Sequence, residues 1–553
     1  MNRERSEKMN RDFDRRRLWI WTVVSLIFAV AHILVVSGRD RVTFHPTAPL
    51  RPYMIGILIL FFFFTWSFYL VLLLCVMKLL RREAGFLYRF RFFAGYFLFM
   101  SVFWILTWPG IFKGDEFYVI RAALSFELSA MQSGLTSVFY IISLLFFPSM
   151  ATIVFFQLVV VCSVFAYVMG NLWERFSTKA KYLLLLPFGL FPVIDANLFT
   201  LRASLVGWLF LLLLMYLWKM KDEPICIIKI SVVAGLICAW RSEFIYLIVC
   251  LPLLLLIRKK ASLRGVLLVL LGICIFWQGF SLPNKIAANG QNKYPISLVL
   301  NPIANLFTEV EELKGPDVHA DVMAINEVVD AAQLRKDASV RNISQYWNIP
   351  DVLPGETLSR FMKAAIRLIV YNPGKFLKYR WQTFLYTNSF YDGYTNHPGG
   401  EDMDAIKKLT YYGMDYGSYF LLSKPPLGYD LRMKVISLLA CRTYEKGNIH
   451  GNPLLVILYN VLPVALLSAV ALIIYAVKKK WERFWLLLLA MVQFPLVFLT
   501  APAMFFMYYF CFYLCGWAFM AYAVSMWAET KIDSDRAGVR TDVKIQSRKT
   551  DDQ

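Results

Sequence analysis

Charged residues are scarce in this sequence. They make up only 17% of its 553 residues, whereas 58% are hydrophobic and 16% are aromatic. A soluble domain contains about 25% charged and about 45–50% apolar residues, so the composition excludes a water-soluble globular protein. The apolar residues fall into runs close to the roughly 20 residues that cross the hydrocarbon core of a bilayer. We therefore predict an all-α polytopic membrane protein with about 12 transmembrane helices.

Cysteine outside the apolar runs is also rare. Eight of the nine cysteines fall within predicted spans, where a free thiol acts as a small hydrophobic group, and only Cys441 lies outside them. This distribution argues against a disulfide framework, and no spacing of Cys and His indicates zinc. The sequence also lacks a visible internal repeat, which argues against a transporter built from inverted repeats without excluding one.

Short basic segments predict which side of the membrane each loop faces. They lie at 1–17, 81–91, 258–264 and 478–483. The positive-inside rule places all four in the cytoplasm, so we expect a multi-pass protein of the cell membrane with both termini cytoplasmic. These segments account for most of the net charge of +20, which therefore does not indicate a nucleic-acid partner. The predicted spans are 18–36, 54–80, 93–109, 150–172, 182–194, 200–218, 225–240, 244–257, 265–282, 453–477, 484–500 and 503–527.

The same pattern divides the chain into five parts. They are an N-terminal tail with two transmembrane helices (1–92), a transmembrane core with an acidic first outer loop at 110–149 (93–282), a mainly helical extracytoplasmic domain (283–452), the last transmembrane helices (453–527) and a cytoplasmic tail (528–553). Residues 136–147 are apolar but short for a crossing, so we interpret them as an interfacial or re-entrant piece. We expect irregular stretches at 392–402 and 422–430.

The first outer loop holds the strongest candidate site. Asp115 and Glu116 follow a Pro-Gly break and a second glycine, and an amphipathic helix comes directly after them. Adjacent carboxylates at a bilayer surface can act as a general base, bind a divalent cation such as Mg²⁺ or Mn²⁺, or do both. The alternative is structural: Asp115 caps the N-terminus of the helix, where negative charge is favoured.

Two further groups of charges interrupt apolar runs at the same predicted face. Arg241 and Glu243 lie in the run 225–257, and a guanidinium is suited to a phosphate or pyrophosphate. Asp195 and Arg202 flank a turn between two spans and could line a polar pocket under the first loop. The alternatives are a helix turn with internally paired charges for the first group, and a helix cap with a snorkelling arginine for the second.

This layout resembles the GT-C superfamily of integral-membrane glycosyltransferases. The resemblance rests on an acidic pair in the first outer loop, charged outer turns and a late extracytoplasmic domain. The strings WPGIFKGDEF (108–117) and YNPGKFLKYR (371–380) also resemble those of uncharacterised multi-pass bacterial proteins grouped with that superfamily. The resemblance covers most of the chain in the arrangement of its segments, but only a few dozen residues in sequence motifs. The sequence departs from the pattern in having two additional spans before the helix that leads into the acidic loop.

The resemblance implies a transferase of the cell envelope. Its donor would be a polyprenyl-phosphate-linked sugar, and its acceptor an envelope glycopolymer or lipid on the outer face of the bilayer. Asp115, with Glu116 beside it, would act as the base, directly or through bound Mg²⁺ or Mn²⁺. Arg241, and Arg202 with it, would hold the donor phosphate and stabilise the charge that develops on it, with Glu243 orienting Arg241.

Two other functional classes are compatible with the sequence. An O-antigen-like polymerase or ligase also has about a dozen spans and a large late outer loop, but relies on arginines in that loop instead of a first-loop acid. A polytopic transporter or flippase would be expected to bury charges at mid-span in discontinuous helices, whereas the ionisable groups here cluster toward one face.

Overall fold

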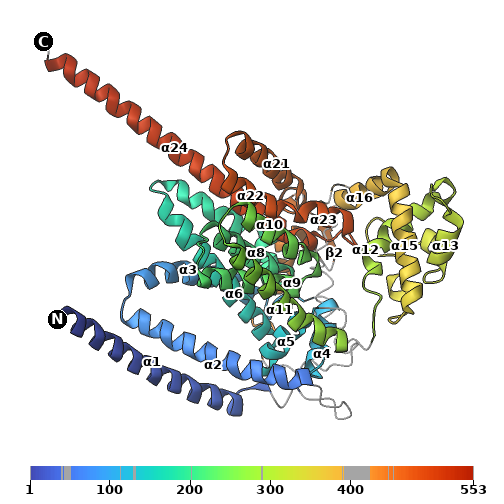
Figure 1. Cartoon of the computed structure of the whole chain (residues 1–553), viewed down its shortest axis with the longest axis horizontal. Helices are drawn as coiled ribbons and strands as arrows, with labels where there is room; N and C mark the ends of the chain where they lie inside the picture. Colours follow the sequence, from blue (N-terminus) through green and yellow to red (C-terminus); the bar gives the residue numbers. More distant parts are fainter. Residues whose placement is uncertain are drawn as a thin grey trace.

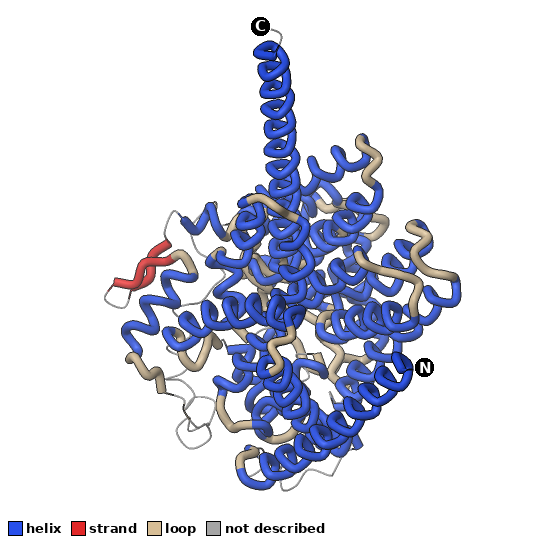
Figure 2. The backbone as a smooth tube through the Cα atoms, turned by 90° about the vertical axis from the view of Figure 1, so that its left-hand side faces the viewer, coloured by secondary structure: helices blue, strands red, loops and turns tan. Residues whose placement is uncertain are grey.

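The protein is almost entirely helical in its computed structural model (Figure 1). The structure describes residues 2–38, 42, 52–112, 114–128, 133–200, 202–287, 290–388, 390, 422, 424–445, 448–451 and 454–551. Within these ranges strands occur as one antiparallel hairpin, β1 (Arg442–Glu445) and β2 (Asn448–Gly451), in which Arg442 pairs with Gly451 (Figure 2). The predicted irregular stretch at 392–402 lies outside the described residues.

The first half of the chain contains most of the apolar helices. In chain order they are α1 (Asn2–Val35), α2 (Pro52–Leu80), α3 (Ala84–Leu106), α4 (Gly114–Leu124), α5 (Gly134–Phe146), α6 (Met150–Leu172), η2 (Trp173–Arg175), η3 (Lys179–Gly189), α7 (Phe191–Leu198), α8 (Ala203–Trp218), α9 (Pro224–Trp240), η4 (Ser242–Tyr246), α10 (Leu247–Ile257) and α11 (Leu263–Ala287).

The second half begins with shorter, more polar helices and returns to apolar ones. They are α12 (Ile296–Leu306), η5 (Phe307–Glu312), α13 (Val318–Asn326), α14 (Ala331–Lys336), η6 (Tyr346–Asn348), α15 (Gly355–Tyr371), α16 (Pro373–Thr387), α19 (Tyr429–Leu439), α20 (Leu454–Leu458), α21 (Leu462–Val477), α22 (Trp481–Met491), α23 (Gln493–Thr500), η8 (Phe506–Tyr508) and α24 (Phe510–Asp551).

Eight helices in the described part of the chain are long and apolar enough to cross a membrane, so the predicted helical membrane protein is confirmed at this level. They are Leu18–Val35, Pro52–Leu80, Ala84–Leu106, Met150–Arg175, Leu263–Ala287, Val456–Val477, Trp481–Thr500 and Phe510–Ile532. The expected span at 182–194 consists of two helices, η3 and α7, whose axes are bent by 52° relative to each other. If this pair crosses the membrane as one unit, it is a ninth candidate span in the described part of the chain. The expected spans at 200–218, 225–240 and 244–257 are the shorter apolar helices α8, α9 and η4 with α10. The count of twelve therefore stays a prediction.

Two of the predicted basic loops, 258–264 and 478–483, meet at one end of the bundle, which we call the basic end. Arg258, after α10, donates to Glu482 at the start of α22 (2.9 Å) and to the carbonyl of Leu217 at the end of α8 (3.2 Å). In Figure 1 the chain also begins and ends on this side. The opposite end, where α3 leads into α4, we call the acidic-loop end.

Helix α5 ends in contact with α1, α2 and α6, and the re-entrant nature of residues 136–147 stays a prediction. The ring of Phe146 packs against Phe68 of α2 and Phe156 of α6, with centroids 5.0 Å apart in both pairs. His32 Nε2 in α1 donates to the carbonyl of Phe146 (2.7 Å), and His32 Nδ1 lies 2.9 Å from the hydroxyl of Tyr69. A helix end within lipid needs such a partner because its last carbonyls have none in the helix. The two additional N-terminal helices thus hold α5 in place.

The described residues of the segment 283–452 are mainly helical and divide between two cores. Helices α12 to α15 enclose a small core of their own, lined by residues such as Leu300, Ile325 and Phe361, and lie with α16 on the right of Figure 1. By contrast, Met433 and Leu439 of α19 belong to the main core. Between the two, buried Arg380 of α16 donates to the carbonyls of Phe498 and Ala501, both at 2.8 Å.

Candidate functional site

The turn before α4 is fixed against the end of α7. The amide of Ile111 donates to the carbonyl of Leu198 (3.0 Å), and Ile111 forms a parallel bridge with Phe199. Gly110 has φ +135, a conformation that residues with a Cβ rarely adopt. A Cβ at this position would also lie 2.4 Å from Cγ2 of Val154. Glycine is therefore required here, both for the backbone angle and for the close approach to α6.

We expect Gly110→Ala to destabilise the protein strongly, because the new methyl group meets Val154 and the backbone is strained at the same time. The loss should be about 1–3 kcal/mol, measured as a lower unfolding temperature in detergent. Gly85→Ala in the first turn of α3 is the matched control, since a Cβ there has nothing within 4 Å. Equal unfolding temperatures for the two variants would contradict this account of the turn.

Arg432 of α19 holds the same turn from the other side. It is completely buried; its Nε donates to the carbonyls of Thr107 (3.2 Å) and Trp108 (3.0 Å), and its Nη2 donates to the carbonyl of Gly110 (2.8 Å). A guanidinium is suited to this role because its donors form a fixed fork. The sequence prediction did not single out Arg432, because one arginine in a mixed apolar segment looks like any surface residue.

The two carboxylates of α4 face different surroundings. Both lie in the first turn, where the helix dipole favours negative charge. Asp115 is exposed, whereas Glu116 is only 1% exposed. The Glu116 carboxylate lies close enough to Tyr140 of α5 to act on its hydroxyl electrostatically. That hydroxyl donates to Oγ1 of Thr200 (2.8 Å).

Arg241 and Glu243 form a close ion pair at the acidic-loop end, in the turn between α9 and α10. Nη2 of Arg241 lies 2.5 Å from Oε1 of Glu243, and its Nε donates to Oε2 at 3.3 Å. Arg241 is only 4% exposed, and its guanidinium lies 5.8 Å from the ring centre of Tyr508. Arg202 is partly exposed and acts electrostatically on both Glu243 and Tyr508. The structure therefore brings together two of the predicted groups, Arg202 and the pair Arg241–Glu243.

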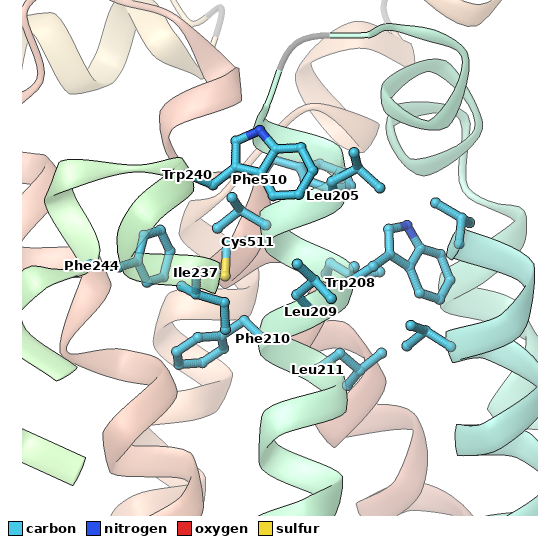
Figure 3. Close-up of a cluster of buried hydrophobic side chains, with 14 of the residues drawn as sticks. Leu205, Trp208, Leu209, Phe210, Leu211, Ile237, Trp240, Phe244, Phe510 and Cys511 are labelled. Carbon is cyan, nitrogen blue, oxygen red and sulfur yellow. The ribbon is translucent and has the colours of Figure 1, made fainter. Parts of the chain in front are cut away.

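Trp240 contacts α5 and directly precedes Arg241 in the chain. Its ring lies 5.8 Å from that of Phe139, the residue before Tyr140, and its backbone continues into Arg241. It caps the buried cluster of α8, α9 and α24, and its indole nitrogen points away from Ile237 and Phe210 (Figure 3). Trp240 is 8% exposed, and within the described residues its indole N–H has no hydrogen-bond acceptor. A buried donor in this state can serve a ligand.

We refer to these residues as the polar cluster. Its members are Glu116, Tyr140, Thr200, Arg202, Trp240, Arg241, Glu243 and Tyr508, and the exposed Asp115 directly precedes Glu116 in the chain. Tyr140, Thr200, Trp240 and Tyr508 were not predicted, because their positions in the sequence carry no charge pattern and only the fold brings them to the acids and arginines.

Asp195 lies in a different environment from Arg202. Its Oδ2 accepts from the hydroxyl of Tyr459 (2.9 Å), which also donates to the carbonyl of Leu439. The neighbouring Asn197 is used inside the bundle, where its Oδ1 accepts from Trp208 Nε1 (2.7 Å). Both side chains hold α7 against its neighbours.

A divalent cation would find few protein ligands in this region. Among the described residues no group of three His, Cys, Asp or Glu side chains comes together. Asp115 and Glu116 do not form a common ligand set, because one faces solvent and the other the interior. These residues do not fit a Mg²⁺ or Mn²⁺ site built by the protein.

Comparison with models of known protein families, with curated proteins and with solved structures finds no match.

Proposed function

We propose that this protein is a GT-C-type glycosyltransferase of the plasma membrane. It would move a sugar from a polyprenyl-phosphate-linked donor to an envelope glycopolymer or lipid, with the acidic-loop end outside and both termini in the cytoplasm. The observation that carries the proposal is that the two carboxylates of α4, one exposed and one buried, lie at the same end of an apolar bundle as Arg202 and Arg241. The resemblance of the first outer loop to that superfamily supports it.

The proposed reaction is a single displacement. The carboxylate of Asp115 takes the proton from an acceptor hydroxyl, and the acceptor oxygen forms a bond to the anomeric carbon of the donor sugar. The bond between that carbon and the phosphate oxygen breaks, and the polyprenyl phosphate leaves with the electron pair. An exposed carboxylate is suited to the first step because an incoming acceptor can reach it.

The arginines would act on the leaving phosphate. Negative charge grows on the phosphate as the glycosidic bond breaks, and fixed cations aimed at that charge lower the barrier. Arg202 and Arg241 carry two positive charges, and Glu243, which pairs with Arg241, offsets one of them. Arg202 is the more exposed of the two and would meet the phosphate first, while Arg241 is oriented by Glu243. The indole of Trp240 would donate a further hydrogen bond.

The function is tested with purified protein in proteoliposomes and a panel of polyprenyl-phosphate sugars. We expect one donor to release polyprenyl phosphate when an acceptor is present. Arg202→Gln should lower this rate by about 10²–10³-fold, the usual effect of removing one preorganised donor. Lys285→Gln, in the last turn of α11, is the control and should leave it unchanged. A panel without any turnover would argue for transport instead.

Arg241 needs a paired variant, because Arg241→Gln alone would leave the carboxylate of Glu243 without its counter-ion. The double variant Arg241→Gln with Glu243→Gln removes both charges and should fold. We expect it to lose transfer about as strongly as Arg202→Gln. Full activity in the double variant would remove Arg241 from the proposed site.

A further inference from the structure

A second site of different character lies at the basic end of the bundle. An apolar pocket lies between α6, η3, α8, α22 and α24. Its wall includes Leu172, Phe188, Leu214, Trp218 and Phe519. It is separate from the polar cluster, and none of the cluster residues lines it.

The position of the cavity follows from the helix ends around it. Leu172 is the last residue of α6, Trp218 is the last residue of α8, and Arg483 lies in the first turn of α22. These ends all belong to the basic end defined above. A lipid with its tail among these helices would therefore have its head group at the basic loops.

Two arginines lie at the edge of this cavity. Arg483 is part of its wall, is partly exposed, and lies 5.7 Å from the ring centre of Tyr522. Arg175 is exposed, and its guanidinium lies 4.0 Å from the ring centre of Trp218. Both aromatic rings line the cavity. The two cations are thus held at its rim by the same rings that form its apolar wall.

The acids around this edge have other partners or face solvent. Glu482 pairs with Arg258 (2.9 Å) and Lys260 (3.3 Å), Glu529 of α24 accepts from the amides of Ser177 and Thr178, and Glu174 is exposed. Within the described residues neither Arg175 nor Arg483 forms an ion pair. Basic pockets between transmembrane helices on the cytoplasmic side are the type of site that binds anionic lipid head groups, and a guanidinium can bind a phosphate through two parallel hydrogen bonds.

We propose that this cavity holds one acyl chain of an anionic phospholipid, with the lipid phosphate between Arg175 and Arg483. The cavity supplies the apolar surface and the two guanidinium groups supply the charge. The occupant is a membrane phospholipid and not the sugar donor, because the phosphate of a donor has to reach the arginines of the polar cluster at the opposite end. The exclusion of the donor rests on the proposed function, whereas retention of an anionic phospholipid is measured without any transfer assay.

The experiment is native mass spectrometry of the full chain in mild detergent, after incubation with equal amounts of phosphatidylglycerol and phosphatidylcholine. We expect one phosphatidylglycerol retained per chain in clear preference to phosphatidylcholine. Arg483→Gln should lower this occupancy on the order of tenfold, the effect of one lost charge-assisted contact. Ala518→Trp, which fills the cavity wall, should lower it as well, whereas Lys480→Gln at the same end should not.

A second measurement keeps the test independent of how the variants fold. Phosphatidylglycerol should raise the unfolding temperature of the unaltered chain, and phosphatidylcholine should not. Equal retention of the two lipids, or unchanged retention in both Arg483→Gln and Ala518→Trp, would overturn the proposal. Displacement of phosphatidylglycerol by a matched amount of polyprenyl phosphate would also overturn it, because the cavity would then belong to the donor.

Discussion

Asp115→Asn is expected to lower the rate of sugar transfer by about 10²–10⁴-fold, which is the usual contribution of a positioned general base. Asparagine keeps the size of the side chain, but it cannot accept the proton of the acceptor hydroxyl. The unfolding temperature and the amount of protein in the membrane should therefore change little. The measurement is turnover of the donor in proteoliposomes beside the unaltered chain.

Glu127→Gln is the matched control for this variant. Glu127 is also exposed and also follows the acidic loop, but it lies beyond the end of α4, eleven residues after Glu116. A continuous helix of that length would separate the two by about 16 Å, so we expect full activity in Glu127→Gln. Normal glycan transfer in Asp115→Asn would contradict the role of Asp115 and favour the polymerase or ligase class.

Arg432→Leu is expected to have the largest effect on stability. The substitution removes the donors that hold the carbonyls of Thr107, Trp108 and Gly110, and these carbonyls are buried where water cannot replace the arginine. We expect a loss of about 3 kcal/mol or more in the free energy of unfolding, measured by thermal unfolding in detergent. Arg432→Lys should be more stable than Arg432→Leu, because an ammonium group can still donate to a carbonyl. It should be less stable than the unaltered chain, because an ammonium group lacks the planar fork of donors.

Lys434→Gln is the control on the same helix. Lys434 is exposed and pairs with Asp430 (2.8 Å) on the surface, so its loss should cost less than about 1 kcal/mol. An Arg432→Leu protein as stable as Lys434→Gln would mean that the turn before α4 does not depend on α19. In that case the acidic loop would be held by its contacts with α7 and α6 alone.

The membrane character of the fold could be predicted from the sequence because it depends on composition over windows of about 20 residues. Whether a short apolar helix crosses the bilayer could not be predicted in the same way. The runs at 200–218 and 225–240 match α8 (Ala203–Trp218) and α9 (Pro224–Trp240) within three residues, but both helices are shorter than the roughly 20 residues of a full crossing. The bend of 52° between η3 and α7 also depends on tertiary packing, although Pro192 at the start of α7 marks the place.

The candidate site was predictable only where charge interrupts an apolar run. Arg202, Arg241 and Glu243 stand out for this reason, and they lie together in the structure. Asp195 stands out equally in the sequence, but in the structure its carboxylate accepts a hydrogen bond from Tyr459. An aspartate in an apolar run can stabilise the packing of a helix or form part of a functional site, and the sequence pattern does not distinguish the two. Arg432 contacts residues more than 300 positions away, so no local pattern could assign it to the acidic loop.

The most direct test of the account is the side of the membrane on which Asp115 lies. Cysteine is introduced at position 115 or at position 260, and intact cells are treated with a thiol reagent that does not cross the membrane, with labelling read above that of the unaltered chain. We predict labelling at position 115 that slows when a polyprenyl-phosphate sugar is present, and labelling at position 260 only after the cells are opened. Labelling at position 260 with protection at position 115 in intact cells would contradict the account.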